Sequence, residues 1–133
     1  MTQYKTNRIN FDFERMFDCN YPFRFIGVCT KKGKLLEFVY RKDITPLFSD
    51  TELNFSVLKT ALISSIRDNE LMMGKMLYTV TTFENVKRAT IPIDDELLLL
   101  CSFEKNADDS VIKDIFEIVK QLQTLTNNYD TKS

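Results

Sequence analysis

Residues 96–104 read ELLLLCSFE, a run in which both alternating sets of positions are apolar. Residues 23–30, FRFIGVCT, have the same character after Arg24. A strand that is apolar on both faces belongs in the middle of a sheet that helices cover on both sides. The two runs therefore predict the two central strands of one sheet, with Leu99 in its core.

Three further stretches predict the flanking strands of this sheet. Residues 35–40, LLEFVY, follow the turn sequence KKGK and form a predicted hairpin with the first strand. Residues 75–82 and 88–93 alternate between apolar and other side chains, as flanking strands do. Pro92 lacks an amide donor, so we expect its end of the strand to fray or to border an edge. The predicted strand order is 2-1-5-4-3.

A well-marked helix is predicted between the second and third strands. Ser49 and Glu52 fit a capping box, in which the hydroxyl caps one amide and the carboxylate reaches back to the other. Phe48 and Leu53 have the spacing of a hydrophobic staple. We place this helix at about residues 50–69, with a single apolar stripe. The stripe consists of Leu53, Val57, Leu58, Ala61, Leu62 and Ile66.

Two terminal helices complete the prediction. Residues 9–19 have near-helical apolar spacing and end before Pro22. The last helix starts at a cap formed by Asp108 or Asp109. Its apolar positions are Val111, Ile112, Ile115, Phe116, Val119 and Leu122. The fold class is α/β of the α+β type: a five-stranded antiparallel sheet in the order αββαβββα, with helices on both faces.

The length of 133 residues fits one domain, which we place at residues 9–126, with flexible tails at 1–8 and 127–133. With 18 basic and 19 acidic residues the net charge is −1, so no overall field favours nucleic acid or an anionic membrane. The longest apolar run, Leu97–Cys101, is too short to span a membrane, and the first fifteen residues lack the apolar segment of a signal peptide. We therefore expect a cytoplasmic protein with no specific nucleic-acid partner.

Absent residue types narrow the chemistry. The chain has no histidine, which excludes histidine-based acid–base catalysis and Ser-His-Asp triads. Its three glycines cannot build a phosphate-binding glycine-rich loop. Cys19, Cys29 and Cys101 are widely spaced and form no CxxC pair, so we interpret them as buried free thiols and not as metal ligands. We predict that the protein is not an enzyme and carries no cofactor or metal.

The element order resembles the roadblock/LC7 fold, a relative of the longin and profilin-like folds. The resemblance lies in residues 21–50, YPFRFIGVCTKKGKLLEFVYRKDITPLFSD, and 86–122, VKRATIPIDDELLLLCSFEKNADDSVIKDIFEIVKQL. These segments are also similar to a family of small uncharacterised proteins of ammonia-oxidising archaea. The roadblock resemblance implies a homodimer that pairs through the middle helix and third strand, and a non-catalytic platform for small GTPases.

Two charged segments are candidate sites. Lys31, Lys32 and Lys34 at the hairpin tip, followed by Arg41 and Lys42, are a candidate anion-binding surface. We favour the alternative, a solvated turn that protects the hairpin edge. The acidic run 94–96, DDE, supplies oxygen ligands for a divalent cation, but a polar turn is the favoured interpretation because no EF-hand spacing follows.

A methionine-rich junction precedes the third strand and has two open interpretations. It comprises Leu71, Met72, Met73, Gly74 and Met76. Methionine fills gaps in cores, and it also recurs at interaction surfaces. Because the third strand is an edge that needs cover, we predict a dimer interface there. The predicted interface residues are Leu62, Ile66, Met73, Met76, Leu77 and Thr79.

The sequence thus predicts a dimeric, non-catalytic protein-interaction or regulatory module, with a small GTPase as the partner that the resemblance implies. The alternative is a small-ligand sensor of the profilin-like type. That alternative predicts a sizeable closed pocket between the sheet and a helix.

Overall fold

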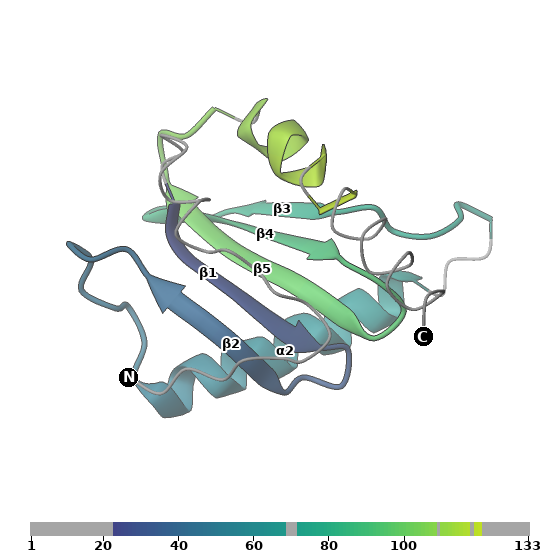
Figure 1. The fold of residues 1–133 in the computed structure, drawn as a ribbon, viewed down its shortest axis with the longest axis horizontal. Helices are drawn as coiled ribbons and strands as arrows, with labels where there is room; N and C mark the ends of the chain where they lie inside the picture. The colour runs from purple at the N-terminus through teal and green to yellow at the C-terminus, as the bar shows by residue number, and fades with distance from the viewer. Residues whose placement is uncertain (1–22, 69–71, 109, 118, 121–133) are drawn as a thin grey trace, which may run out of the picture.

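A computed structural model describes residues 23–68, 72–108, 110–117 and 119–120. Within this part of the chain, five antiparallel strands form one sheet in the order β2-β1-β5-β4-β3, as the sequence predicts (Figure 1). The labelled elements are β1 (Phe23–Thr30), β2 (Leu35–Tyr40), α2 (Asp50–Asp68), β3 (Thr79–Thr82), β4 (Val86–Pro92) and β5 (Leu97–Glu104). The predicted helix at 9–19, both predicted tails, Cys19 and Leu122 lie outside the described residues.

The two central strands are the two that are apolar on both faces. β1 pairs with β2 on one side and with β5 on the other, and β5 also pairs with β4. Leu99 in β5 lies opposite Val28 on one side and Ile91 on the other, and it is fully buried. The sheet order follows because only a central strand can bury both of its faces.

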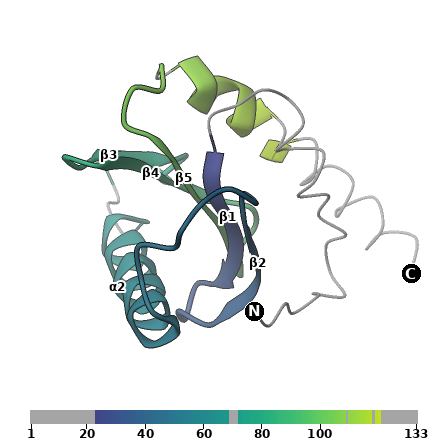
Figure 2. The same cartoon turned by 90° about the vertical axis from the view of Figure 1, so that its left-hand side faces the viewer.

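The sheet separates two cores, one beneath each helical layer (Figure 2). On one face, Leu53, Val57 and Ala61 of α2 pack on a cluster that includes Phe25 and Leu100. On the other face, the helical residues 110–117 and 119–120 cover a larger cluster. The central members of this larger cluster are Ile26, Ile91, Leu99, Phe103, Ile112, Ile115 and Val119.

Both predicted caps are present. The Glu52 amide donates to the Ser49 hydroxyl at 3.2 Å, and the Ser49 amide donates to the Glu52 carboxylate at 3.3 Å, which completes the capping box. At the last helix the cap is Asp108, whose carboxylate accepts from the Ser110 amide at 2.9 Å. This hydrogen bond lowers the pKa of Asp108.

The hairpin between β1 and β2 turns at Gly33, which has a φ of +96°. A Cβ at this position would lie 2.6 Å from Leu58 Cδ1 and 3.0 Å from Leu58 Cα. The turn therefore packs directly on α2, and both the backbone conformation and the close approach require glycine.

The third strand is shorter than the predicted 75–82. β3 begins at Thr79, which pairs with Thr90, so continuing the ladder would set Leu77 opposite Pro92. Pro92 has no N–H to donate, and the ladder ends before reaching it. At its other end, β4 begins at Val86 and not at residue 88, because the β3–β4 turn is closed by a hydrogen bond from the Phe83 amide to the Val86 carbonyl.

The prediction that the apolar residues of α2 lie on a single stripe is wrong. Leu53, Val57 and Ala61 are buried with Ser64, whereas Leu58, Leu62 and Ile66 are exposed. Successive residues of an α-helix are rotated by about 100° around the helix axis. The exposed residues therefore lie on another side of the helix than the buried ones. Helix α2 is therefore apolar on two opposite faces.

Candidate functional site

The exposed face of α2 carries an apolar stripe, here called the outer stripe. Its members are Phe55, Leu58, Leu62, Ile63 and Ile66, whose exposed fractions run from 42% at Leu58 to 69% at Ile66. They recur at helical spacing over three turns, outside the buried face that Leu53, Val57 and Ala61 form. A contiguous apolar surface of this kind marks an interaction site more often than isolated exposed side chains do.

The six predicted interface residues lie in α2, in the segment before β3 and at the start of β3. Leu62 and Ile66 belong to the outer stripe, and Met73 and Leu77 are exposed in the segment before β3. Met76 and Thr79 are half-buried. β3 lies at the edge of the sheet. Their contact with a second copy stays a prediction.

Three members of the outer stripe are not predicted as exposed from the sequence. The predicted stripe leaves out Phe55 and Ile63, and it places Leu58 together with residues that are buried. The helical spacing of Phe55, Leu62 and Ile66 is the signal that indicates a second apolar face.

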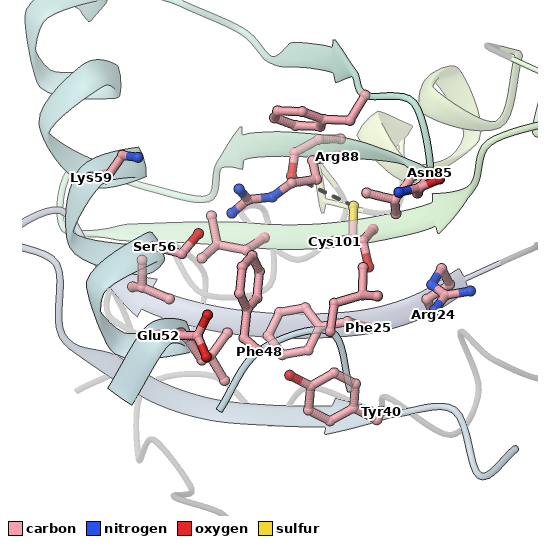
Figure 3. A pocket seen from close by; sticks show the side chains of 18 of the residues that line it. Arg24, Phe25, Tyr40, Phe48, Glu52, Ser56, Lys59, Asn85, Arg88 and Cys101 are labelled. Atoms are coloured by element: carbon pink, nitrogen blue, oxygen red, sulfur yellow. Dashed lines mark hydrogen bonds between the residues drawn. The ribbon is translucent and has the colours of Figure 1, made fainter. Parts of the chain in front are cut away.

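A groove lies between the N-terminal half of α2 and the sheet (Figure 3). Its volume is about 840 Å³, its walls are mostly apolar, and it opens to solvent on one side. Phe25 and Phe48 lie at the groove (Figure 3), and Phe55 and Phe83 also line it. The ligand-sensor alternative predicts a closed pocket, so the groove matches that prediction in position and size and differs from it in being open.

Arg88 is the charged residue that reaches into the groove from the middle of the sheet. Its guanidinium extends from β4 toward α2 (Figure 3) and donates one hydrogen bond, to the Thr60 hydroxyl oxygen at 3.3 Å. The side chain is half-buried, and desolvation lowers the pKa of its guanidinium. Among the described residues it has no acidic partner.

The other two arginines near the groove are paired. Arg41 contacts Glu104 at 3.0 Å, donates to the Phe23 carbonyl at 3.0 Å and bonds Asp43 at 2.6 Å. Arg24 approaches Glu104 at 3.4 Å. The hydrogen bond from Arg41 lowers the pKa of Asp43. These contacts connect the start of β1, the end of β2 and the end of β5.

This network corrects the predicted basic surface. Arg41 lies at the opposite end of the hairpin from Lys31, Lys32 and Lys34, so the cations that are close in sequence do not form one cluster. Lys32 and Lys34 are exposed, and Lys31 is half-buried beside the Glu96 turn, where its amide donates to the Glu96 carbonyl. Anion binding by this tip stays a prediction that nothing in the geometry favours.

The acidic run 94–96 forms the expected polar turn. The Asp94 carboxylate accepts from the amides of Glu96 and Leu97 at 2.7 and 2.9 Å, an arrangement that caps the turn before β5. Asp95 is exposed and lies 3.7 Å from Lys75. In the described ranges, no group of three cysteine or acidic side chains is placed to hold a metal ion.

The two described cysteines are buried, free thiols, as predicted. Burial raises the pKa of Cys29 to about 12 and raises the pKa of Cys101 further. Both remain protonated at neutral pH and are poor nucleophiles for that reason. Within the described residues no helix is long and apolar enough to cross a membrane.

No family model matches the chain, and no curated protein matches it in sequence. Solved structures do match. Gliding protein MglB from Thermus thermophilus aligns with a TM-score of 0.68 at 13% identity, covering 92% of this chain and 96% of that chain. MglB in a tetrameric arrangement gives 0.67 at 12%, covering 93% and 98%. A roadblock/LC7 domain from Streptomyces avermitilis gives 0.60 at 9%, covering 82% and 86%. The chain therefore has a roadblock/LC7-like fold, as the resemblance implied, whereas the similarity to an archaeal family stays a prediction.

Proposed function

We propose that this protein is a non-catalytic, homodimeric interaction module of the cytoplasm. The observation that carries the proposal is the outer stripe, which exposes five large apolar side chains on one helix face. Burying such a side chain contributes about 1.5–3 kcal/mol, so a second copy of the same helix is a favourable cover for the stripe. A two-fold axis matches identical patches on both copies.

The edge strand supports the same arrangement. β3 pairs with β4 along one side, and its other side is the edge of the sheet. Exposed edges favour pairing with another strand, and the short length of β3 limits that pairing to a few residues. A dimer in which α2 faces α2 and β3 lies beside β3 would cover Leu62, Ile66 and Leu77 together.

The partner that we propose for this dimer is a small GTPase, on the strength of the roadblock/LC7-like fold. The described part of the chain favours a binding role over catalysis. Its thiols are protonated, and the carboxylates of Glu52 and Asp94 are engaged in capping hydrogen bonds. A ligand-sensing role is the second candidate, and the groove beneath α2 favours it.

Sedimentation equilibrium at micromolar concentration tests the dimer. The wild-type protein should give roughly twice the monomer mass of 15.6 kDa. The double variant Leu62→Glu/Ile66→Glu should give the monomer mass, because two carboxylates would be buried in each half of the interface. Ser65→Glu is the matched control, since Ser65 is exposed on the same helix outside the stripe. A monomeric wild type, or a double variant that stays dimeric, contradicts the proposal.

Affinity capture from native cytoplasm tests the partner. Wild-type protein and the monomeric double variant serve as baits, with GTP or GDP added. Enrichment of a small GTPase on the wild-type bait, reduced on the monomeric bait, supports a platform that requires the dimer. If the GTPase, once purified, binds neither bait, the proposed partner is contradicted, while the proposed dimer is not affected.

A further inference from the structure

We infer that the groove beneath α2 binds a small amphiphilic anion, whose carboxylate or phosphate head pairs with Arg88 and whose apolar body lies against Phe25 and Phe48. This inference does not depend on the dimer, because Arg88 and both phenylalanines belong to one chain. It rests on three features: a cation without a counter-ion among the described residues, a mostly apolar cavity of ligand size, and neutral polar groups in the lining of that cavity.

The Arg88 guanidinium is placed where a charge is costly. Arg88 lies in the middle of β4, with Thr81 opposite it on β3 and Ser102 opposite it on β5. Its one hydrogen bond goes to Thr60, whose hydroxyl donates to the Ser56 carbonyl at 2.9 Å and so presents its oxygen to Arg88. A guanidinium carries five N–H donors, and one neutral acceptor does not offset the removal of its charge from water.

The surrounding acids do not neutralise this charge. Glu104 is the carboxylate used by Arg24 and Arg41, and Glu52 accepts from the Ser49 amide. Glu84 lines the rim of the groove in an exposed position and forms no ion pair with Arg88. Arg24 and Arg41 pair with Glu104, whereas Arg88 has no acidic partner among the described residues. An incoming oxyanion would supply the missing partner.

The cavity has the size and lining of a small-molecule site. Its volume of about 840 Å³ falls within the range of roughly 300–1,000 Å³ that ligand pockets occupy. Phe25, Phe48 and Leu53 supply apolar walls, while Tyr40 and Ser56 offer hydroxyl groups (Figure 3). Burial raises the pKa of Tyr40, so its hydroxyl remains protonated and available as a donor.

The chemistry of the Arg88 guanidinium determines which head group the ligand carries. Its planar fork of N–H groups fits two oxygens of one carboxylate or phosphate, which gives both charge compensation and orientation. The apolar remainder of the groove then selects a hydrocarbon body over a small hydrophilic anion. A simple inorganic ion would leave the phenylalanine walls exposed to water.

Titration calorimetry with ligands of one chain length and different heads tests the inference. Decanoate, decyl phosphate and decanol are titrated below their micellar concentrations into wild type, Arg88→Met and Arg88→Lys. The anion that fits the site should bind wild type better than decanol by at least about tenfold, the value of one or more charge-assisted hydrogen bonds. Arg88→Met should lose that advantage, and Arg88→Lys should retain part of it. Lys113→Met, a charge removal at an exposed position of the helix that covers the other face of the sheet, should bind as wild type does.

Thermal unfolding of the same variants separates a ligand-binding arginine from a structural one. Without ligand, Arg88→Met should keep or raise the melting temperature, because it removes a desolvated charge that has no ion pair. A large drop would assign Arg88 a structural role and overturn the inference. Equal binding of decanol and both anions, equal binding by Arg88→Met, or no binding of any ligand would overturn it as well. Sedimentation of each sample shows whether the dimer is affected, so failure here is distinguishable from failure of the proposed function.

Discussion

Replacing Gly33 by alanine tests how the hairpin packs on helix α2, and Gly74 provides a matched control. Both glycines have positive φ, +96° at Gly33 and +82° at Gly74. A Cβ at Gly74 would meet nothing within 4 Å, whereas one at Gly33 would lie 2.6 Å from Leu58 Cδ1 and 3.0 Å from Leu58 Cα. The two substitutions therefore share the backbone cost and differ in the steric cost.

The magnitudes follow from these distances. Alanine at positive φ destabilises the folded state by about 1–2 kcal/mol. The lower entropy of the unfolded chain offsets about 0.4–1 kcal/mol of this cost. Gly74→Ala should therefore lose about 1 kcal/mol of unfolding free energy. Gly33→Ala adds overpacking against Leu58 at about 1–3 kcal/mol, for a loss of about 2–4 kcal/mol in all. Adding Leu58→Ala to Gly33→Ala should recover part of the loss, because it removes the Cδ1 contact but not the backbone contact.

Urea unfolding followed by circular dichroism measures five proteins: wild type, Gly33→Ala, Gly74→Ala, Leu58→Ala and the double variant Gly33→Ala/Leu58→Ala, with the m-value checked for two-state behaviour. Unfolding should be compared at one protein concentration, because a dimer makes the midpoint concentration-dependent. Equal losses for Gly33→Ala and Gly74→Ala would refute the packing of the turn on α2. The contact with Leu58 would be refuted if the double variant loses as much unfolding free energy as Gly33→Ala and Leu58→Ala lose together.

Four further outcomes are expected. Leu99→Ala should lose about 2–5 kcal/mol of unfolding free energy, the range for a fully buried leucine. Leu47→Ala, at an exposed position, should lose less than about 0.5 kcal/mol. A loss below about 1 kcal/mol at Leu99 would contradict its central place in the sheet. Cys29 and Cys101 should not react with a thiol reagent at pH 8 until the protein unfolds, so native protein should titrate at most one of its three cysteines and unfolded protein all three. Because burial raises the pKa of Cys29 from 9.0 to about 12, its contribution to stability is complete below pH 9 and is lost as the pH rises toward 12, and Cys29→Ala should flatten that alkaline decline. The triple change of Lys31, Lys32 and Lys34 to glutamate should leave the fold and the oligomeric state unchanged, and salt-resistant duplex DNA binding that disappears in this variant would instead make the hairpin tip a functional site.

Local sequence patterns predict a strand well where both of its faces are buried. The bounds of β1 and β2 follow from the apolar run, the KKGK turn and the alternation around them. The predicted start of β3 at residue 75 is too early, because β4 constrains the ladder with β3 to begin at the Thr79–Thr90 pair, which the alternation at Met76 and Tyr78 does not show. That constraint depends on register, which a single strand does not reveal.

The site is harder to predict because it depends on distant contacts. Helix α2 has two apolar faces, and sequence alone does not say which one meets the sheet and which one meets solvent. Arg88 looks like any polar residue of an alternating strand. Its lack of an acidic partner is visible only once the fold has assigned Glu104, on the neighbouring strand, to Arg24 and Arg41. The groove likewise requires α2, the loop before it and the β3–β4 turn to meet.

Phe55 connects the two proposals, because it belongs to the outer stripe and also lines the groove. If both proposals hold, a ligand that contacts Phe55 changes the free energy of dimerisation, and dimerisation must change ligand affinity by the same factor. Decanoate affinity should therefore vary between protein concentrations below and above the dimer dissociation constant, and the Leu62→Glu/Ile66→Glu monomer should show the low-concentration value at all concentrations. Phe55→Ala should abolish the variation while leaving Arg88 in place to bind the anion. An affinity that is the same for monomer and dimer would show that the ligand and the second copy act on separate surfaces of α2.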